Sequence, residues 1–271
     1  MRVADLPLAW RTEFILHRFD GQVREEADAI IVTTPSAPTF YWGNFVLMPR
    51  APRSEDLAPW CAAFEREVAA GRPEVRHVAF GYSDDRPPGE AWIQAGFEYS
   101  INVALVAERH QVDWEALSAP GEFRALVSDA DYAAALDLQS LDTWGFEPTG
   151  YRRHRAAQMA RIRRMNAQGQ AAWFGWWQGS ELLANCGLIW APGDSVARFQ
   201  YVLTHRDHRR QGLARALVQA VSRYAFDTLG RQQVVICADP AEVAIHLYQS
   251  LGYVPVDRAH MLQRRAPQDR P

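Results

Sequence analysis

The chain has 271 residues, of which 48% are hydrophobic and 23% charged, the ordinary mixture of a soluble globular protein. Because one domain typically runs about 100–200 residues, this length is comfortable for two domains. The net charge of −3 argues against a general nucleic-acid binder, and no apolar run approaches the roughly 18–20 residues of a membrane span.

Short strands and helices alternate in the amino-terminal part of the chain. Runs rich in aromatic and β-branched residues predict strands, which lie at 14–19, 29–34, 39–48, 75–82 and 99–107. Helical spacing of apolar residues predicts helices at 54–70 and 89–97. The following segment, 111–122, combines mixed charge with turn residues, which predicts a linker.

The carboxy-terminal part has a fuller pattern of the same kind. Strands are predicted at 123–128, 171–177, 182–190, 197–204 and 231–238, and turn residues predict a hairpin between the second and the third. Helices are predicted at 129–138, 151–166, 213–229 and 241–253, before an extended segment through Met261. Mixed strands and helices in this order predict an α/β (α+β) fold with a mixed sheet.

The most informative stretch runs from Tyr201 to Ala214, where a strand leads through a tight turn into a helix. Free backbone N–H groups and the positive dipole end make a helix start a ready phosphate site. Gly212 lets the backbone approach an anion, and Arg209 and Arg210 add charge. The alternative is an ordinary strand–turn–helix with solvated arginines. The absence of lysine from the sequence excludes a P-loop, and a lone glycine does not make a dinucleotide fingerprint.

The pattern R-x-x-G-x-A, formed by Arg209, Gly212 and Ala214, resembles the pyrophosphate-binding motif of the GNAT superfamily of N-acetyltransferases. Its place between a long strand and a long helix matches that family. The resemblance implies that the loop binds coenzyme A, with acetyl-CoA as co-substrate, and that the preceding strand pairs with the pantetheine arm. The implied coenzyme-binding residues are Val202, Leu203, Thr204, Arg209, Arg210, Gln211, Gly212, Leu213 and Ala214.

A second block, from Ala244 to Tyr253, resembles the GNAT pattern A-x-x-L-Y-x-x-x-G-F/Y. The resemblance implies that Tyr248 is catalytic, lying beside the coenzyme A sulfur and protonating the leaving thiolate. A phenol with a pKa of about 10 is protonated at neutral pH and able to donate. The alternative is a helix tyrosine that only packs against its neighbours. The chain departs from the family at Ala241, where relatives often carry asparagine.

The general base is open. Many relatives place a glutamate on the strand before the motif, but this chain has Arg198, Phe199 and Gln200 there, and none accepts a proton at neutral pH. Acidic residues that could approach from loops, or simply be solvated there, are Asp142, Glu147, Glu181 and Asp194. A water relay or spontaneous deprotonation of the amine are the further alternatives.

The first half of the chain resembles a GNAT domain incompletely. Residues 92–97 match the family's helix-to-strand ending, but no R-x-x-G-x-G/A precedes the helix at 54–70. Prolines 49, 52 and 59 also remove backbone donors that phosphate would need. We therefore expect two GNAT-like domains, each a mixed, mostly antiparallel sheet flanked by helices. They are a degenerate domain at 1–110, a linker at 111–122 and a catalytic acetyltransferase domain at 123–271.

Three further clusters carry open alternatives. The arginine-rich segment 151–164 is either a solvated helix face or a surface that recognises an anionic substrate or the 3′-phosphate of the coenzyme. Trp144-Gly145-Phe146 is a candidate contact for the acceptor. Tryptophans that line a pocket or build the core are Trp173, Trp176, Trp177 and Trp190.

Together these observations lead us to expect an acyl-CoA-dependent N-acyltransferase in which an amine attacks the thioester directly. The alternative is a non-catalytic acyl-CoA-binding or scaffold protein. The expected partner is a small-molecule or peptide amine, with no nucleic acid, membrane or metal, and a homodimer is a possible assembly. Three widely spaced cysteines and the lack of a secretory signal at the amino terminus predict a cytoplasmic protein.

Overall fold

The structure is a computed structural model that describes residues 1–115 and 119–269. The chain folds into two compact units. The first comprises Met1–Ala104, Ala238–Pro240 and the residues from Val256 onward, and the second comprises Leu105–Cys237 and Ala241–Pro255. This division differs from the expected boundaries at 110 and 123, because the carboxy-terminal strand groups with the first unit. Residues 116–118 of the expected linker lie outside the described residues.

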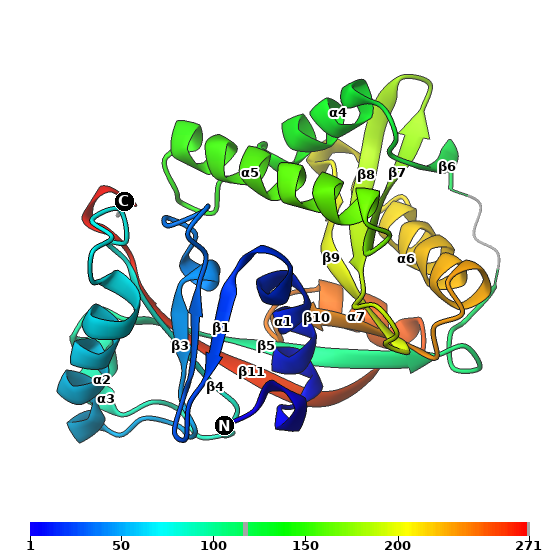
Figure 1. Ribbon diagram of the computed structural model, residues 1–271. Coiled ribbons are helices and arrows are strands. Elements are labelled where there is room, and N and C mark those ends of the chain that lie inside the picture. The colour runs from blue at the N-terminus through cyan, green and yellow to red at the C-terminus, as the bar shows by residue number, and fades with distance from the viewer. Residues whose placement is uncertain (116–118, 270–271) are drawn as a thin grey trace. The chain divides into compact units, whose positions relative to one another are not determined.

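The first unit is built on a sheet of short strands (Figure 1). The strand order is β1-β2-β3-β4-β11, with the start of β5 beside β11. Its strands are β1 (Gln22–Glu25), β2 (Ile30–Thr33), β3 (Phe45–Leu47), β4 (Val78–Tyr82), β5 (Glu98–Glu108) and β11 (Val254–Arg264). Its helices are α1 (Leu8–Asp20), α2 (Leu57–Phe64) and α3 (Glu90–Gln94). β3 and β4 are parallel, whereas β1–β2, β2–β3 and β4–β11 are antiparallel.

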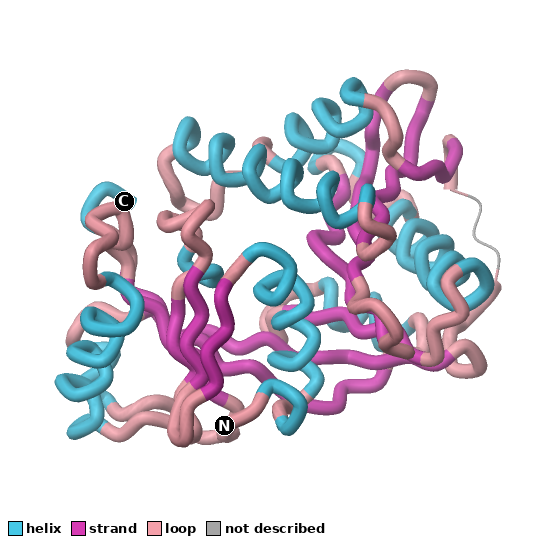
Figure 2. The backbone as a smooth tube through the Cα atoms, in the orientation of Figure 1, coloured by secondary structure: helices cyan, strands magenta, loops and turns pink. Residues whose placement is uncertain are grey.

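Helices cover both faces of this sheet, with α1 on one side and α2 and α3 on the other (Figure 2). Successive residues of β3 point to opposite faces of the sheet, so this strand contributes to the apolar core on each side. Phe45 stacks on Trp10 of α1 at 5.6 Å, whereas Val46 belongs to the cluster of Phe64 and Trp92. The first unit is therefore a sheet packed on two sides.

The strand predicted at 14–19 is wrong, because these residues belong to α1. A remote carboxylate holds the start of this helix: Asp257 accepts hydrogen bonds from the backbone N–H groups of Leu8 at 2.7 Å and Ala9 at 2.9 Å. A capping group that lies so far along the chain leaves no local start signal in the sequence, and Pro7 at the cap position has no side-chain acceptor.

The strands of the second unit follow the order β10-β9-β8-β7-β6. They are β6 (Glu122–Ala125), β7 (Ala171–Gln178), β8 (Glu181–Ile189), β9 (Val196–Thr204) and β10 (Gln233–Ala238). The helices are α4 (Asp129–Gln139), α5 (Pro148–Ala167), α6 (Leu213–Arg223) and α7 (Ala244–Ser250). The neighbours are antiparallel except for the parallel pair of β9 and β10. α4 and α5 cover one face and α6 the other (Figure 1).

The two units repeat one arrangement of elements. In each, two parallel neighbouring strands are joined through a helix, β3–α2–β4 in the first and β9–α6–β10 in the second. A short helix, α3 or α7, and a long strand then follow. The predicted fold class, mixed and mostly antiparallel sheets flanked by helices, is confirmed.

Candidate functional site

An open strand edge lies at the centre of the second unit. β9 pairs with β8 as far as Thr204, but its parallel pairing with β10 covers only Val196 to Arg198. From Phe199 to Thr204, the side of β9 toward β10 therefore has no strand partner in this pair. Its open N–H and C=O groups are strong hydrogen-bonding groups that need a partner. The buried Oγ1 of Thr204 also has no hydrogen-bond partner among the residues described.

A bulge lies within this open segment. The register between β8 and β9 shifts between Asn185 and Gly187, and Tyr201 adopts a φ of +52°. Such a φ is uncommon for a residue other than glycine and indicates local strain. Because a bulge bends its strand and increases the twist, it accounts for the separation of β9 from β10 beyond Arg198.

The loop after β9 presents backbone donors. Arg210 and Gly212 have φ of +63° and +79°, and α6 begins at Leu213. No backbone N–H from Arg209 to Arg215 donates a hydrogen bond within the part of the chain that the structure describes. Successive free N–H groups beside a helix start form an anion site, to which the exposed Arg209 and Arg210 add positive charge.

Gly212 faces open space. A Cβ built on it meets no atom within 4 Å, and its φ of +79° disfavours every other residue. The strand, the loop and the start of the helix thus bring together, in one continuous segment, all of the predicted coenzyme-binding residues: Val202, Leu203, Thr204, Arg209, Arg210, Gln211, Gly212, Leu213 and Ala214.

Tyr248 lies on α7 with only 5% of its surface exposed. Its hydroxyl makes no hydrogen bond among the residues that the structure describes. Burial, and secondarily the neighbouring Cys186, raise the pKa of Tyr248 above its ordinary value. Burial likewise raises the pKa of the Cys186 thiol. Both groups are therefore neutral at pH 7, and the Tyr248 hydroxyl keeps a proton to donate.

A buried polar cluster packs against the bulge from the side of α4 and α5. Arg155 donates from Nε and Nη2 to Oε1 of Gln139, at 3.1 and 2.5 Å. Nε2 of Gln139 donates to Oδ1 of Asn185 at 2.8 Å. The Arg155 guanidinium also lies over the Tyr201 ring at 3.7 Å, and the Tyr201 and Tyr151 hydroxyls are 2.7 Å apart. These polar side chains converge where β9 leaves β10.

The sequence interpretation did not identify this cluster. Arg155 was one arginine of a crowded helix, and its neighbours Arg152 and Arg163 are indeed partly exposed and paired with Asp137 and Asp129. Asn185 gave the one available signal, since it is a single polar residue in an apolar strand and is fully buried here. A buried polar side chain needs a partner, so its position marks a site worth examining.

The acidic candidates for a general base have other roles. Glu147 caps α5 by accepting from the Thr149 and Gly150 N–H groups, which lowers its pKa. Asp194 accepts from the Val196 N–H at 3.1 Å, and Glu181 lies 3.4 Å from His208. Asp142 accepts from the Trp144 N–H at 3.1 Å. Burial and the contact with Tyr201 raise the pKa of Tyr151, and the charge of Asp142 adds a smaller effect in the same direction. Of the four, Asp142 is the one whose charge acts on the polar cluster.

The loop between α4 and α5 adjoins this cluster. Phe146 stacks on Tyr151 at 6.3 Å, whereas Trp144 is 55% exposed.

The other tryptophans mostly belong to the core. Trp173, Trp177 and Trp190 are buried, and Trp176 lies near Phe123 at the sheet edge. Trp176, with Trp114, Phe123 and Tyr224, lines a surface hollow of the second unit, so it alone of the four tryptophans follows the pocket alternative.

An open strand edge that runs into a helix start with free N–H groups offers hydrogen-bond donors and acceptors suited to an extended, amide-bearing ligand that ends in phosphate. Residues 135–253, which contain this site, match the model of the "Acetyltransferase (GNAT) family". This match assigns residues 135–253 to that family and indicates an acyltransferase domain there that draws its acyl group from an acyl-CoA. No curated protein matches the sequence.

Solved structures resemble the whole chain in fold. A functionally unknown conserved protein from Staphylococcus epidermidis is 13% identical, with a TM-score of 0.74 over 92% of this chain and 95% of its own. A GCN5-related N-acetyltransferase from Kribbella flavida is 16% identical, with a TM-score of 0.62 over 95% and 96%. A tandem GNAT protein from the clavulanic acid biosynthesis pathway is 15% identical, with a TM-score of 0.59 over 91% and 79%.

Two further findings concern other kinds of site. Within residues 1–115 and 119–269, no three His, Cys, Asp or Glu side chains are placed to hold a metal ion. None of the helices in those ranges is long and apolar enough to cross a membrane.

Proposed function

We propose that this chain is an acetyl-CoA-dependent N-acetyltransferase that acts on a small-molecule or peptide amine by direct attack on the thioester. The observation that carries the proposal is the unpaired segment of β9 running into a loop of unpaired N–H groups. Both need hydrogen-bond partners, and the amides and pyrophosphate of coenzyme A supply them in that order.

Each part of the segment has a role toward the coenzyme. The backbone of Val202 to Thr204 pairs with the pantetheine amides, and the orphaned Thr204 Oγ1 adds a polar contact. Backbone N–H groups from Gln211 to Ala214 bind the pyrophosphate, helped by Arg209 and Arg210. Gly212 leaves room for this approach. The residues present therefore fit the ligand that the family uses.

The main contribution of the protein to this reaction is to position the two reactants. The neutral amine forms the new N–C bond as the C–S bond breaks, and the Tyr248 hydroxyl donates its proton to the departing sulfur. The acylated nitrogen then releases its extra proton to solvent to give the neutral amide, and solvent returns a proton to the Tyr248 phenolate. Because no carboxylate hydrogen-bonds to the cluster at the bulge within the described residues, the amine loses its proton to solvent before attack. Holding both reactants in one cleft supplies much of the rate.

The first unit lacks the open edge. Its parallel pair stays closed to the end of β3, since Leu47 is in register with Gly81 and the Met48 N–H donates to the Gly81 carbonyl at 2.7 Å. Trp10 lies against Gly81, and its indole N–H donates to the Tyr82 carbonyl at 2.9 Å. No strand surface is left there for a pantetheine arm to pair with.

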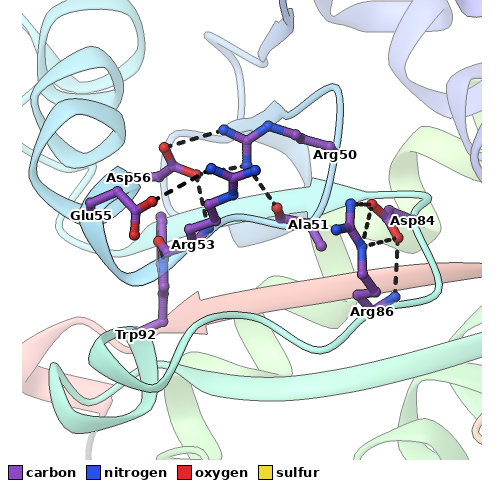
Figure 3. A network of polar contacts seen from close by, with 8 residues as sticks. All are labelled: Arg50, Ala51, Arg53, Glu55, Asp56, Asp84, Arg86 and Trp92. Atoms are coloured by element: carbon purple, nitrogen blue, oxygen red, sulfur yellow. Dashed lines mark hydrogen bonds and ion pairs between the residues drawn. The ribbon is translucent and has the colours of Figure 1, made fainter.

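The loop after β3 is also occupied by the protein's own carboxylates (Figure 3). Asp56 accepts from the Arg53 backbone N–H at 2.8 Å and pairs with the Arg50 guanidinium, also at 2.8 Å. Asp84, held by Arg86, accepts from the Ala51 N–H, and these contacts lower its pKa. Because carboxylates already take the donors that a phosphate would need, we propose that only the second unit binds coenzyme.

Isothermal titration calorimetry with acetyl-CoA tests the proposal. We expect saturable binding of one molecule per chain. No binding at millimolar ligand overturns the proposed function, and two equivalent sites per chain overturn the assignment of one competent unit. The readout does not depend on knowing the acceptor.

A second candidate, a non-catalytic acyl-CoA-binding protein, is favoured by the lack of a carboxylate base at the cluster. Release of coenzyme A across a library of amines separates the two functions. Turnover that falls at least about tenfold in Tyr248→Phe, with acetyl-CoA affinity unchanged, identifies an enzyme. Binding without turnover of any amine identifies the non-catalytic protein.

A further inference from the structure

Arg155 is a buried cation without an acidic partner. Only 9% of its surface is exposed, and its hydrogen bonds within the described residues go to one neutral group, the Gln139 amide oxygen. Its Nη1 makes no hydrogen bond within the described residues and is not among the fully buried atoms, so this end of the guanidinium is open to a ligand. No Asp or Glu contributes to the electrostatics of Arg155. The Tyr201 ring supplies the remaining contact, a cation–π interaction at 3.7 Å.

Such an arrangement is energetically unfavourable in the free protein. Guanidinium groups stay charged in proteins, and buried charges are normally paired because desolvation costs several kcal/mol per ion, by order of magnitude. The burial of Arg155 lowers its pKa, the direction that desolvation without an anion gives. An amide oxygen and an aromatic face compensate only part of this cost. The missing partner is an anion.

A buried unsatisfied donor belongs to the same cluster. Asn185 is fully buried, its Oδ1 accepts from Gln139 and from Trp173 at 2.8 Å each, and its Nδ2 has no partner in the described part of the chain. Gln139 connects this amide to Arg155. An orphaned buried amide and an unpaired guanidinium on one network indicate a polar ligand rather than two separate packing defects.

The position of the cluster assigns the ligand. Arg155 lies on Tyr201, the bulged residue within the open segment of β9, and Tyr151 connects it to the loop between α4 and α5. The anion would therefore bind beside the acyl end of the open edge rather than at the pyrophosphate loop. His154, whose pKa is lowered to about 4 by burial and by Arg155, adds no charge at neutral pH.

We propose that Arg155 binds a carboxylate of the acceptor, so that the substrate is an amine that also carries a carboxylate, of the amino acid class. One guanidinium matches one carboxylate in charge and in its planar, forked geometry. Binding there positions the amine while neutralising the buried cation. This inference rests on the proposed function, whose acceptor it specifies.

Matched acceptors test the inference. Amino acids with the amine at different distances from the carboxylate are each compared with their own carboxamide, at saturating acetyl-CoA, by release of coenzyme A. The full-length parent should prefer the acid by about 100-fold in kcat/KM, because an unpaired buried charge costs a few kcal/mol. Arg155→Gln should reduce this preference to near unity by slowing the acids, and Arg155→Lys should restore part of it.

Controls separate this role from folding. Arg152→Gln removes an exposed arginine on the same helix and should leave the acid preference unchanged. Acetyl-CoA affinity in calorimetry should be the same in the parent and both Arg155 variants, which shows that the fold and the coenzyme site are intact. If an Arg155 variant does not fold, the ratio of kcat/KM for acid and amide in the parent protein still tests the inference, because that measurement needs no substitution.

The outcomes are distinct from those for the proposed function. Equal use of acids and amides by the parent, or an acid preference that survives in Arg155→Gln, overturns the inference. The inference is also overturned if no acid reacts and none binds in calorimetry in the presence of coenzyme A. The proposed function is decided separately, by the titration with acetyl-CoA. The inference is supported if the parent prefers acids and if Arg155→Gln, but not Arg152→Gln, abolishes that preference.

Discussion

At the scale of single residues, Gly212 is the position of the coenzyme site where we expect a side chain to be least tolerated. Gly212→Val should abolish acetyl-CoA binding in calorimetry, because the new side chain enters the open space beside the loop and strains a φ of +79°. Gly193→Val is the matched control, since Gly193 has a φ of +74° and equally open surroundings in the turn between β8 and β9. The control should lose about 1–2 kcal/mol of stability and bind like the parent. Equal binding by both variants would contradict the motif assignment.

The residues of this loop could be read from the sequence, but their effect could not be fully foreseen. Arg209, Gly212 and Ala214 carry a side-chain pattern, so the loop and helix start are confirmed where they were predicted. The open edge of β9 depends on backbone pairing and on a bulge at Tyr201, which no residue type specifies. The cluster at Arg155 forms only when α4, α5 and β8 pack, and these elements are far apart in the sequence.

At the scale of an element, α1 shows how tertiary structure overrides a local pattern. Residues 14–19 suggest a strand, yet the Asp257 carboxylate caps a helix there. Asp257→Ala should therefore lower the free energy of unfolding by about 1 kcal/mol and Tm by roughly 2–4 °C. Asp257→Asn, which keeps one acceptor oxygen, should lose less. Differential scanning fluorimetry measures both, and an unchanged Tm in Asp257→Ala would contradict the capping role.

At the scale of the whole molecule, the two units do not correspond to the two halves of the sequence. Residues 260–264 of β11 pair with residues 78–82 of β4 in the first unit. The hydroxyl of Tyr41 also binds the carboxy-terminal segment there, donating to Asp269 at 2.7 Å and accepting from the Ala266 N–H at 2.8 Å. In the second unit, Asp113 pairs with Arg215, and its N–H donates to the Leu251 carbonyl at 3.0 Å.

Two fragments test whether the coenzyme-binding unit has the boundaries seen in the structure. Fragment 121–271 begins near the end of the expected linker, so it loses Asp113 and leaves β11 without β4, which exposes an unpaired strand. We expect it to be insoluble or to lack acetyl-CoA binding. Fragment 98–255 keeps all of β5 and the complete second unit, and should bind acetyl-CoA with the affinity of the full chain. Gel filtration and calorimetry compare the two. A soluble 121–271 fragment with full affinity, beside an inactive 98–255 fragment, would show that the coenzyme-binding unit follows the order of the sequence after all.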